Sequence, residues 1–163
     1  MGEVQDAPAD TSPEQAIERL YRRLGGRMWR AVLAFAGDPE VASDAVAEAF
    51  AQVLRRGTEI RDPERWLWRA AFRIAAGELK RRKREVPMVS DDSYEMPEGD
   101  RELVAALSRL SEKQRAAVVL HHAAGHPLRE VAAIIGSTPG AVKVHLMRGR
   151  RRLRELLEEN EDA

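Results

Sequence analysis

The stretch "GSTPGAVKVHLMRGRRRL" (residues 136–153) contains a turn followed by the start of a basic helix. Thr138 precedes Pro139, and a hydroxyl residue followed by proline is typical of a helix N-terminus, where the side chain caps exposed N–H groups. The segment beyond carries five arginines and one lysine as far as Arg154. A shorter apolar helix is predicted at 128–135. A short helix, a turn that contains glycine and a longer basic helix together indicate a helix-turn-helix.

The predicted basic helix has two faces, because side chains repeat at about 3.6 residues per turn. One side carries a stripe that is expected to pack on the rest of the protein: Val142, Leu146, Gly149 and Leu153. The opposite side combines basic and apolar groups, as do helices that place Arg or Lys against guanine and apolar groups against thymine methyls in the major groove. The residues predicted to contact DNA are Thr138, Lys143, Val144, His145, Met147, Arg148 and Arg151.

A solvated amphipathic helix is the alternative interpretation of the same segment. In that case Arg151 would pair with Glu155, and Arg154 with Glu158, at four-residue spacing. The turn, the cap and the short preceding helix have no role in this alternative. They therefore favour the interpretation in which the helix binds DNA.

The whole chain, 163 residues long, is predicted to be all-α and to form two small helical modules. Apolar residues recur at three- and four-residue steps, and no stretch alternates with period two. A leader at 1–12 precedes the first module at 13–84. A flexible acidic linker at 85–100 leads to the helix-turn-helix module at 101–157, and an acidic tail follows at 158–163. Helices are expected at 13–36, 39–55, 63–84, 101–109, 112–124, 128–135 and 139–158, with Gly25-Gly26 weakening or breaking the first.

Charge is segregated along the chain, although the formal net charge is zero. Residues 101–154 hold eleven Lys or Arg against three Asp or Glu, whereas 155–163 hold five acids and no base. The linker has six acids and no base. Such segregation is typical of proteins that bind nucleic acid through one part of their surface.

Composition argues against several other classes of protein. There is no cysteine, so disulfides and thiolate chemistry are excluded. The acidic, polar N-terminus is unlike a signal peptide, and no apolar run approaches the roughly 20 residues that span a bilayer. We therefore predict a cytoplasmic protein that does not insert into a membrane. We also expect no cofactor and no enzymatic activity, because no phosphate-binding glycine loop or catalytic triad order is present.

Histidines are the remaining candidates for metal ligands. His122 and His126 have the four-residue spacing of a zinc-binding pair. Gly125-His126-Pro127, however, is a turn signal that would break the shared helical face, and no third ligand is evident. We predict no metal site.

In the first module, aromatic and basic residues alternate over one short segment, "DPERWLWRAAFRIA" (62–75). Aromatic rings and positive charge together suit the capture of unpaired bases, and stacking contributes roughly 1–3 kcal/mol per base. Trp66 falls on the apolar stripe and is expected to be buried, whereas Trp68 points to the other side.

Over residues 13–84 and 101–157 the chain resembles bacterial sigma factors of the extracytoplasmic-function (ECF) class. "DPEVASDAVAEAF" (38–50) resembles the helix of that family that binds core RNA polymerase. Asp44, Glu48 and Phe50 match its pattern, and Ala47 replaces the usual glutamine. The resemblance implies that Asp44 and Glu48 contact the polymerase.

Two further segments carry the resemblance. Trp66-Leu67-Trp68-Arg69 matches the core of the promoter-melting helix, although Arg73 replaces the usual asparagine. The resemblance implies that the −10 element is bound by Arg61, Arg65, Trp68, Arg69 and Arg73. "LSEKQRAAVVLHHAAGHPLREVAAIIGSTPGAVKVHLMRGRRRL" (110–153) resembles the region that binds the −35 promoter element. His145 stands there where arginine is common.

The resemblance implies a transcription initiation factor. Its first module would bind core RNA polymerase and capture the −10 element, partly as single-stranded DNA. Its second module would bind the −35 element as a duplex, and an anti-sigma factor would hold the protein inactive. One alternative is a stand-alone helix-turn-helix regulator that dimerises on a palindrome, for which the sequence shows no heptad seam. Another is an RNA-binding adaptor that uses its basic helices without sequence preference.

Overall fold

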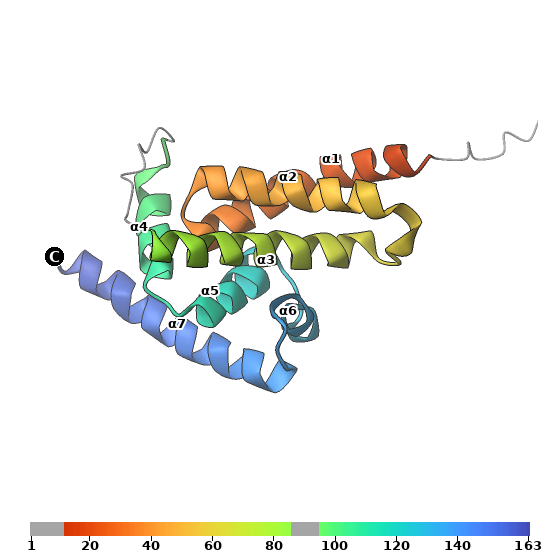
Figure 1. Ribbon diagram of the computed structural model, residues 1–163. Coiled ribbons are helices and arrows are strands. Elements are labelled where there is room, and N and C mark those ends of the chain that lie inside the picture. The colour runs from red at the N-terminus through yellow and green to blue at the C-terminus, as the bar shows by residue number, and fades with distance from the viewer. Residues whose placement is uncertain (1–11, 86–94) are drawn as a thin grey trace, which may run out of the picture.

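The computed structural model describes residues 12–85 and 95–163. Every regular element in these two ranges is a helix, so the prediction of an all-α fold is confirmed (Figure 1). The leader predicted at 1–12 lies outside the described residues except for Ser12. Most of the linker predicted at 85–100 lies outside them as well.

Three long helices form the first module, and each starts in the same way. A side-chain oxygen caps the N-terminus and a proline occupies the first helical position, where its missing N–H costs no hydrogen bond. The caps are Ser12, Asp38 and Asp62. The helices are α1 (Pro13–Ala36), α2 (Pro39–Arg56) and α3 (Pro63–Arg84), with a short 3-10 turn, η1 (Gly57–Glu59), between α2 and α3.

Helix α1 runs without interruption through Gly25-Gly26. A Cβ atom on Gly25 would lie 3.3 Å from the ring of Tyr21, so the glycine leaves room for that ring. Tyr21 in turn meets Phe50 of α2 edge-on, with ring centroids 5.1 Å apart. Gly37 ends the helix in the left-handed conformation (φ 72°), which is the usual C-terminal role of glycine.

The second module begins three residues earlier than predicted. Helix α4 (Glu98–Ser108) follows Pro97 and carries Glu98 and Asp100 in its first turn, where negative charge is favoured by the helix dipole. Helix α5 (Glu112–Val118) continues into a π turn, η2 (Val119–Ala123), and is followed by α6 (Leu128–Ile135) and α7 (Pro139–Glu161). The predicted tail at 158–163 is therefore helical as far as Glu161.

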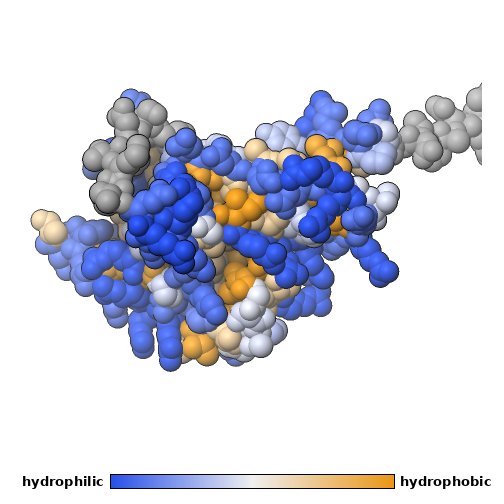
Figure 2. All heavy atoms as spheres, in the orientation of Figure 1, coloured by the Kyte–Doolittle hydropathy of each residue, from blue (hydrophilic) through white to orange (hydrophobic). Residues whose placement is uncertain are grey.

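One hydrophobic core runs through both modules. Helix α3 lies between the other helices of its own module and α6 of the second, and α1 packs against α4 and η2 (Figure 1). Arg115 of α5 is buried and lies over the ring of Phe35 of α1, 5.1 Å from its centroid. In Figure 2 the surface is mostly hydrophilic, and hydrophobic residues are exposed near its centre, around α3.

Candidate functional site

The helix-turn-helix has the expected geometry. Gly136 adopts the left-handed conformation (φ 66°) at the end of α6. Thr138 Oγ1 then accepts a hydrogen bond from Ala141 N at 3.2 Å and so caps α7. On α7 the packed stripe is Val142, Leu146, Gly149 and Leu156, with Leu153 partly buried.

The outer face of α7 is open to solvent. Val144 is 39% exposed and Met147 is 62% exposed, which is unusual for apolar side chains of this size. Lys143, Arg148 and Arg151 are exposed beside them, and His145 is half-buried. Seven side chains predicted to contact DNA are thus on one helix or at its cap.

The arginines of this face are not used in the ion pairs that the alternative interpretation requires. Arg152, which is partly buried, pairs with Glu155 at 3.3 Å and Glu159 at 3.9 Å. Within the two described ranges, no ion pair involves Arg148 or Arg151. Their guanidinium groups therefore remain available to an external anion.

On α3 the two tryptophans are oriented opposite to the prediction. Trp68 is only 1% exposed, and its ring meets that of His126 edge-on at 4.5 Å between centroids. Trp66 is half-buried at the surface. The prediction that Trp68 faces outward is wrong for this structure, because α3 packs on α6 as well as on its own module and buries a second side.

Trp66 instead lies at the surface among the arginines of its own segment and one further arginine, Arg56, that the sequence pattern did not indicate. The guanidinium of Arg56, at the end of α2, sits over its ring, 5.5 Å from the centroid. Arg61, Arg65 and Arg69 line the same shallow depression. The spacing of Arg56 from Trp66 could not have shown this contact, because the turn between their helices sets it.

The other cations predicted to bind the −10 element have different surroundings. Arg61 is exposed. Arg65 is about half exposed and forms an ion pair with Glu130 of α6. This ion pair raises the pKa of the Arg65 guanidinium. Arg69 and Arg73 are exposed and line a hollow between α3 and the second module.

The basic run at 80–84 is largely paired. Arg82 donates to Asp38 at 2.6 Å and to Glu78 at 3.1 Å, which ties the end of α3 to the start of α2. Arg81 pairs with Glu78 and Glu85. The two arginines lower the pKa of Glu78 to about 2. Arg81 and Arg82 are therefore engaged in ion pairs within the protein.

On α2, Asp44 is exposed and Glu48 is partly exposed. Both lie off the buried stripe of that helix. Glu48 accepts hydrogen bonds from Gln52 at 3.0 Å and from Arg55 at 2.8 Å, and these bonds lower its pKa. The carboxylate is thus held ionised in a fixed position.

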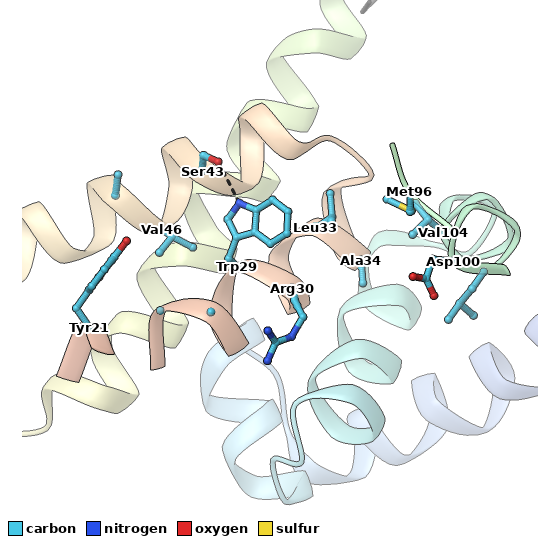
Figure 3. Close-up of a pocket in the computed structure, with 14 residues that line it drawn as sticks. Tyr21, Trp29, Arg30, Leu33, Ala34, Ser43, Val46, Met96, Asp100 and Val104 are labelled. Carbon is cyan, nitrogen blue, oxygen red and sulfur yellow. Dashed lines mark hydrogen bonds between the residues drawn. The ribbon is translucent and has the colours of Figure 1, made fainter. Parts of the chain in front are cut away.

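A hollow of about 820 Å³ lies beside these carboxylates, between α1, α2 and α4 (Figure 3). Trp29 projects into this region and donates from Nε1 to Ser43 Oγ at 3.0 Å. Ala47 lines the α2 side. Where the resembling family has glutamine, this helix therefore presents a methyl group next to Asp44 and Glu48.

No group of three His, Cys, Asp or Glu side chains within residues 12–85 and 95–163 is arranged to hold a metal ion. His126 lies in the turn before α6 and its ring is turned toward Trp68. In the same part of the chain, no helix is long and apolar enough to cross a bilayer.

Comparison with known proteins gives consistent matches. The family model for sigma-70 region 4 matches residues 100–153. The ECF RNA polymerase sigma factor SigE of Mycolicibacterium smegmatis is 28% identical over 170 residues, covering 94% of this chain and 66% of SigE. The chain thus spans slightly less than two thirds of that relative. RNA polymerase sigma factor CarQ of Myxococcus xanthus is 28% identical over 161 residues, covering 91% of this chain and 92% of CarQ.

Among solved structures, the sigma factor RpoE from Bartonella quintana, determined in complex with the anti-sigma factor NepR, has the same fold. The TM-score is 0.73 at 20% identity, with 88% of this chain and 98% of that chain covered.

Proposed function

We propose that this chain is a member of the ECF class of RNA polymerase sigma factors, and that it binds core RNA polymerase and directs it to promoters by recognising −10 and −35 elements. The observation that carries the proposal is the outer face of α7. There, unpaired arginines flank exposed Val144 and Met147 within the segment that matches sigma-70 region 4.

The −35 element is bound as a duplex by α7. The N-terminal turns of the helix enter the major groove, where Arg148 and Lys143 donate to base edges and Val144 and Met147 contact thymine methyls. Arg151 lies further along the helix and contacts phosphate. Gly136 and the Thr138 cap set the angle at which α7 leaves α6.

The −10 element is bound by α3 and the turn before it, in part as a single strand. Arg61, Arg69 and Arg73 supply positive charge, and Trp66 supplies a ring for stacking that Arg56 already holds in place. Trp68 takes part only once the second module has moved away from α3. RNA synthesis itself stays with the polymerase.

Core polymerase is bound through α2. Asp44 and Glu48 are four residues apart on one exposed surface, and Ala47 and the neighbouring hollow add an apolar contact. An anti-sigma factor is proposed as a further partner, since RpoE was solved with NepR.

Co-purification with core RNA polymerase tests this function, followed by run-off transcription from a library of random promoters. Changing both Asp44 and Glu48 to Lys should leave helicity and melting nearly unchanged and abolish co-purification. Changing Glu14 and Glu40, which are exposed near the starts of α1 and α2, is the matched control. If the Asp44/Glu48 variant still co-purifies, α2 does not contact polymerase. If wild-type protein binds specific DNA tightly without polymerase, the stand-alone regulator is the correct function.

A further inference from the structure

A stripe of basic side chains follows one face of α3 toward its C-terminus. Arg69, Arg73 and Lys80 are exposed and line the same hollow between α3 and the second module. Arg69 and Arg73 are four residues apart, a spacing at which two like charges destabilise a helix. The stripe therefore carries a concentration of positive charge that the stability of α3 does not require.

The second module contributes a further cation to the wall of this hollow. Lys113 of α5 is exposed and lines it. Among the lining residues within 12–85 and 95–163, Glu112 is the one carboxylate, and it lies 3.9 Å from Lys80. In the same ranges Arg69, Arg73 and Lys113 form no ion pair. The hollow thus has an excess of three positive charges, and such a gathering of like charges costs free energy until an anion offsets it.

A buried guanidinium lies close to the hollow as well. Phe35 of α1 lines the hollow, and Arg115 of α5 lies over the Phe35 ring, 5.1 Å from its centroid. Arg115 is 9% exposed, and its Nε has no hydrogen-bond partner within the described residues. Burial lowers the pKa of this guanidinium, but an arginine keeps its charge at neutral pH. Arg115 therefore adds to the positive potential in the hollow.

The hollow is large enough for a small ligand, and a glycine opens one of its walls. Its volume of about 340 Å³ falls in the range of roughly 300–1,000 Å³ that is typical of ligand pockets. Gly77, which lies on α3 between Arg73 and Lys80, lines the hollow, and a Cβ atom there would meet nothing within 4 Å. Glycine lowers the stability of a helix relative to alanine, so packing does not explain its presence here. The glycine instead leaves the backbone of α3 accessible between two cations.

We propose that the hollow between α3, α5 and α6 is a binding site for a small anion with two or more linked phosphate groups. Arginine binds phosphate through its planar fork and lysine binds it as a point charge. A single phosphate group carries a charge of about −1.5 to −2 at pH 7 and would leave part of the positive charge unbalanced, whereas a chain of phosphates offsets it. Inorganic oligophosphates and nucleoside polyphosphates share this chemistry. The inference does not depend on the proposed sigma-factor function, because it rests on the charges and the space of the hollow.

Isothermal titration calorimetry of the full chain with inorganic tripolyphosphate, at about 150 mM salt, tests the site. The double variant Arg73→Gln/Lys113→Gln removes one cation of the hollow from each module. The double variant Arg19→Gln/Arg101→Gln is the matched control, because it also removes one exposed arginine from each module. Neither Arg19 nor Arg101 lines the hollow, and neither forms an ion pair within the described residues. The comparison therefore separates a localised site from attraction to the overall charge.

A further variant tests the space of the hollow without changing any charge. Gly77→Leu places a side chain in the hollow, and the fold should accommodate it because a Cβ atom at Gly77 meets nothing within 4 Å. Gly99→Leu is its control, because Gly99 lies in the first turn of α4, away from the hollow, and a Cβ atom there also meets nothing within 4 Å. Thermal melting of both variants checks that they fold.

We expect the wild-type chain to bind one tripolyphosphate, and Arg73→Gln/Lys113→Gln to bind it about tenfold more weakly than Arg19→Gln/Arg101→Gln does. Gly77→Leu should bind about fivefold more weakly than Gly99→Leu. Orthophosphate should bind about tenfold more weakly than tripolyphosphate, because it offsets less of the charge. Equal affinity for ATP and tripolyphosphate would identify the phosphate chain as the part that is bound, and tighter binding of ATP would show that the hollow also holds the nucleoside.

Three results would overturn the proposal. They are the absence of saturable tripolyphosphate binding to the wild-type chain, equal losses in the two double variants, and wild-type affinity in Gly77→Leu. Equal affinities for orthophosphate and tripolyphosphate would likewise contradict a site for linked phosphate groups. Co-purification with core polymerase is scored separately, and its failure would remove the sigma-factor function while leaving the anion site standing.

Discussion

Arg148 and Arg151 share the outer face of α7 but lie at different depths in the proposed complex. Arg148 is nearer the N-terminal turns, which face base edges, so Arg148→Ala should weaken binding to the preferred −35 sequence by about 1–3 kcal/mol and relax base preference there. Arg151→Ala should weaken binding to all sequences alike and reduce the salt slope by about one. Binding of promoter variants by the complex with polymerase, titrated over salt concentration, measures both. A uniform loss for Arg148→Ala would make it a phosphate contact.

Trp66 offers a second test at the scale of one side chain. Because its ring is half-exposed under Arg56, Trp66→Ala should weaken single-strand binding by about 1–3 kcal/mol, while Trp66→Phe should retain most of the affinity. The measurement is the fluorescence anisotropy of a labelled single-stranded oligonucleotide titrated with the full-length protein, with thermal melting as a check on folding. Equal losses for both variants would point to a packing role and against stacking.

The two tryptophans also show where inference from sequence ends for single residues. A helical period assigns one buried stripe to α3, and that stripe includes Trp66. Helix α3 in fact buries a broad arc, with Leu67, Trp68, Ala71 and Phe72 all inside. The second buried side exists only because α6 packs there, and nothing in the local pattern of α3 specifies α6.

At the scale of helices, the close packing of α7 against α5 depends on Gly149. A Cβ atom there would lie 3.0 Å from Val118 Cγ2 and 3.3 Å from Gln114 Cβ. Gly149→Ala should therefore push α7 away from α5 and lower the free energy of unfolding by about 1–3 kcal/mol, despite a better helix propensity.

Gly140→Ala is the matched control on the same helix. A Cβ atom at Gly140 meets nothing within 4 Å, so this change should raise the free energy of unfolding by up to about 1 kcal/mol. Urea denaturation measures both variants. Stabilisation by Gly149→Ala would mean that the two helices can separate at no cost.

Helix starts were the most predictable elements because they depend on adjacent residues. Ser12, Asp38, Asp62, Ser111 and Thr138 all cap helices as their positions before proline or an acidic first turn indicate. The start of α4 was predicted three residues late, since Pro97 and Glu98 fall in a stretch whose composition resembles a linker. The π turn η2 left no comparable signal in its sequence.

At the scale of the molecule, the two modules and their order follow from composition, but their contact does not. Arg65 and Glu130 are 65 residues apart in sequence and each has a local explanation as a solvated charge. Pairing them requires knowing that α6 packs on α3. The outer face of α7 was predicted correctly because it depends on the period of one helix alone.

The contact between modules should respond to pH through His126. The ring is half-buried against Trp68, and burial lowers its pKa below 6.5. The charged groups around it are Glu130 on α6, Glu64 on α3 and Arg27 on α1. The two carboxylates oppose the lowering and Arg27 adds to it. His121 of η2 donates a hydrogen bond from Nδ1 to the main-chain oxygen of His126, 2.7 Å away.

The sign follows from the direction of that shift. When the two modules separate, His126 is solvated and titrates near its ordinary pKa of about 6.5. When they are packed together (the closed form), the ring stays neutral to lower pH. At pH values well above about 6.5, His126 is neutral in both the separated (open) and the closed form, and its contact with Trp68 is at full strength. As pH falls below about 6.5, the open form takes up a proton that the closed form does not, so acid favours opening. The distance distribution between spin labels on Leu54→Cys of α2 and Asn160→Cys of α7, both exposed sites, should therefore broaden on acidification, and His126→Gln should reduce this response. His145→Gln, which changes a histidine on α7, should respond as the wild type does, and His122, whose pKa burial also lowers, remains in both variants and cancels in the comparison. Identical acid responses in the two variants would show that another group, and not His126, couples the modules to pH.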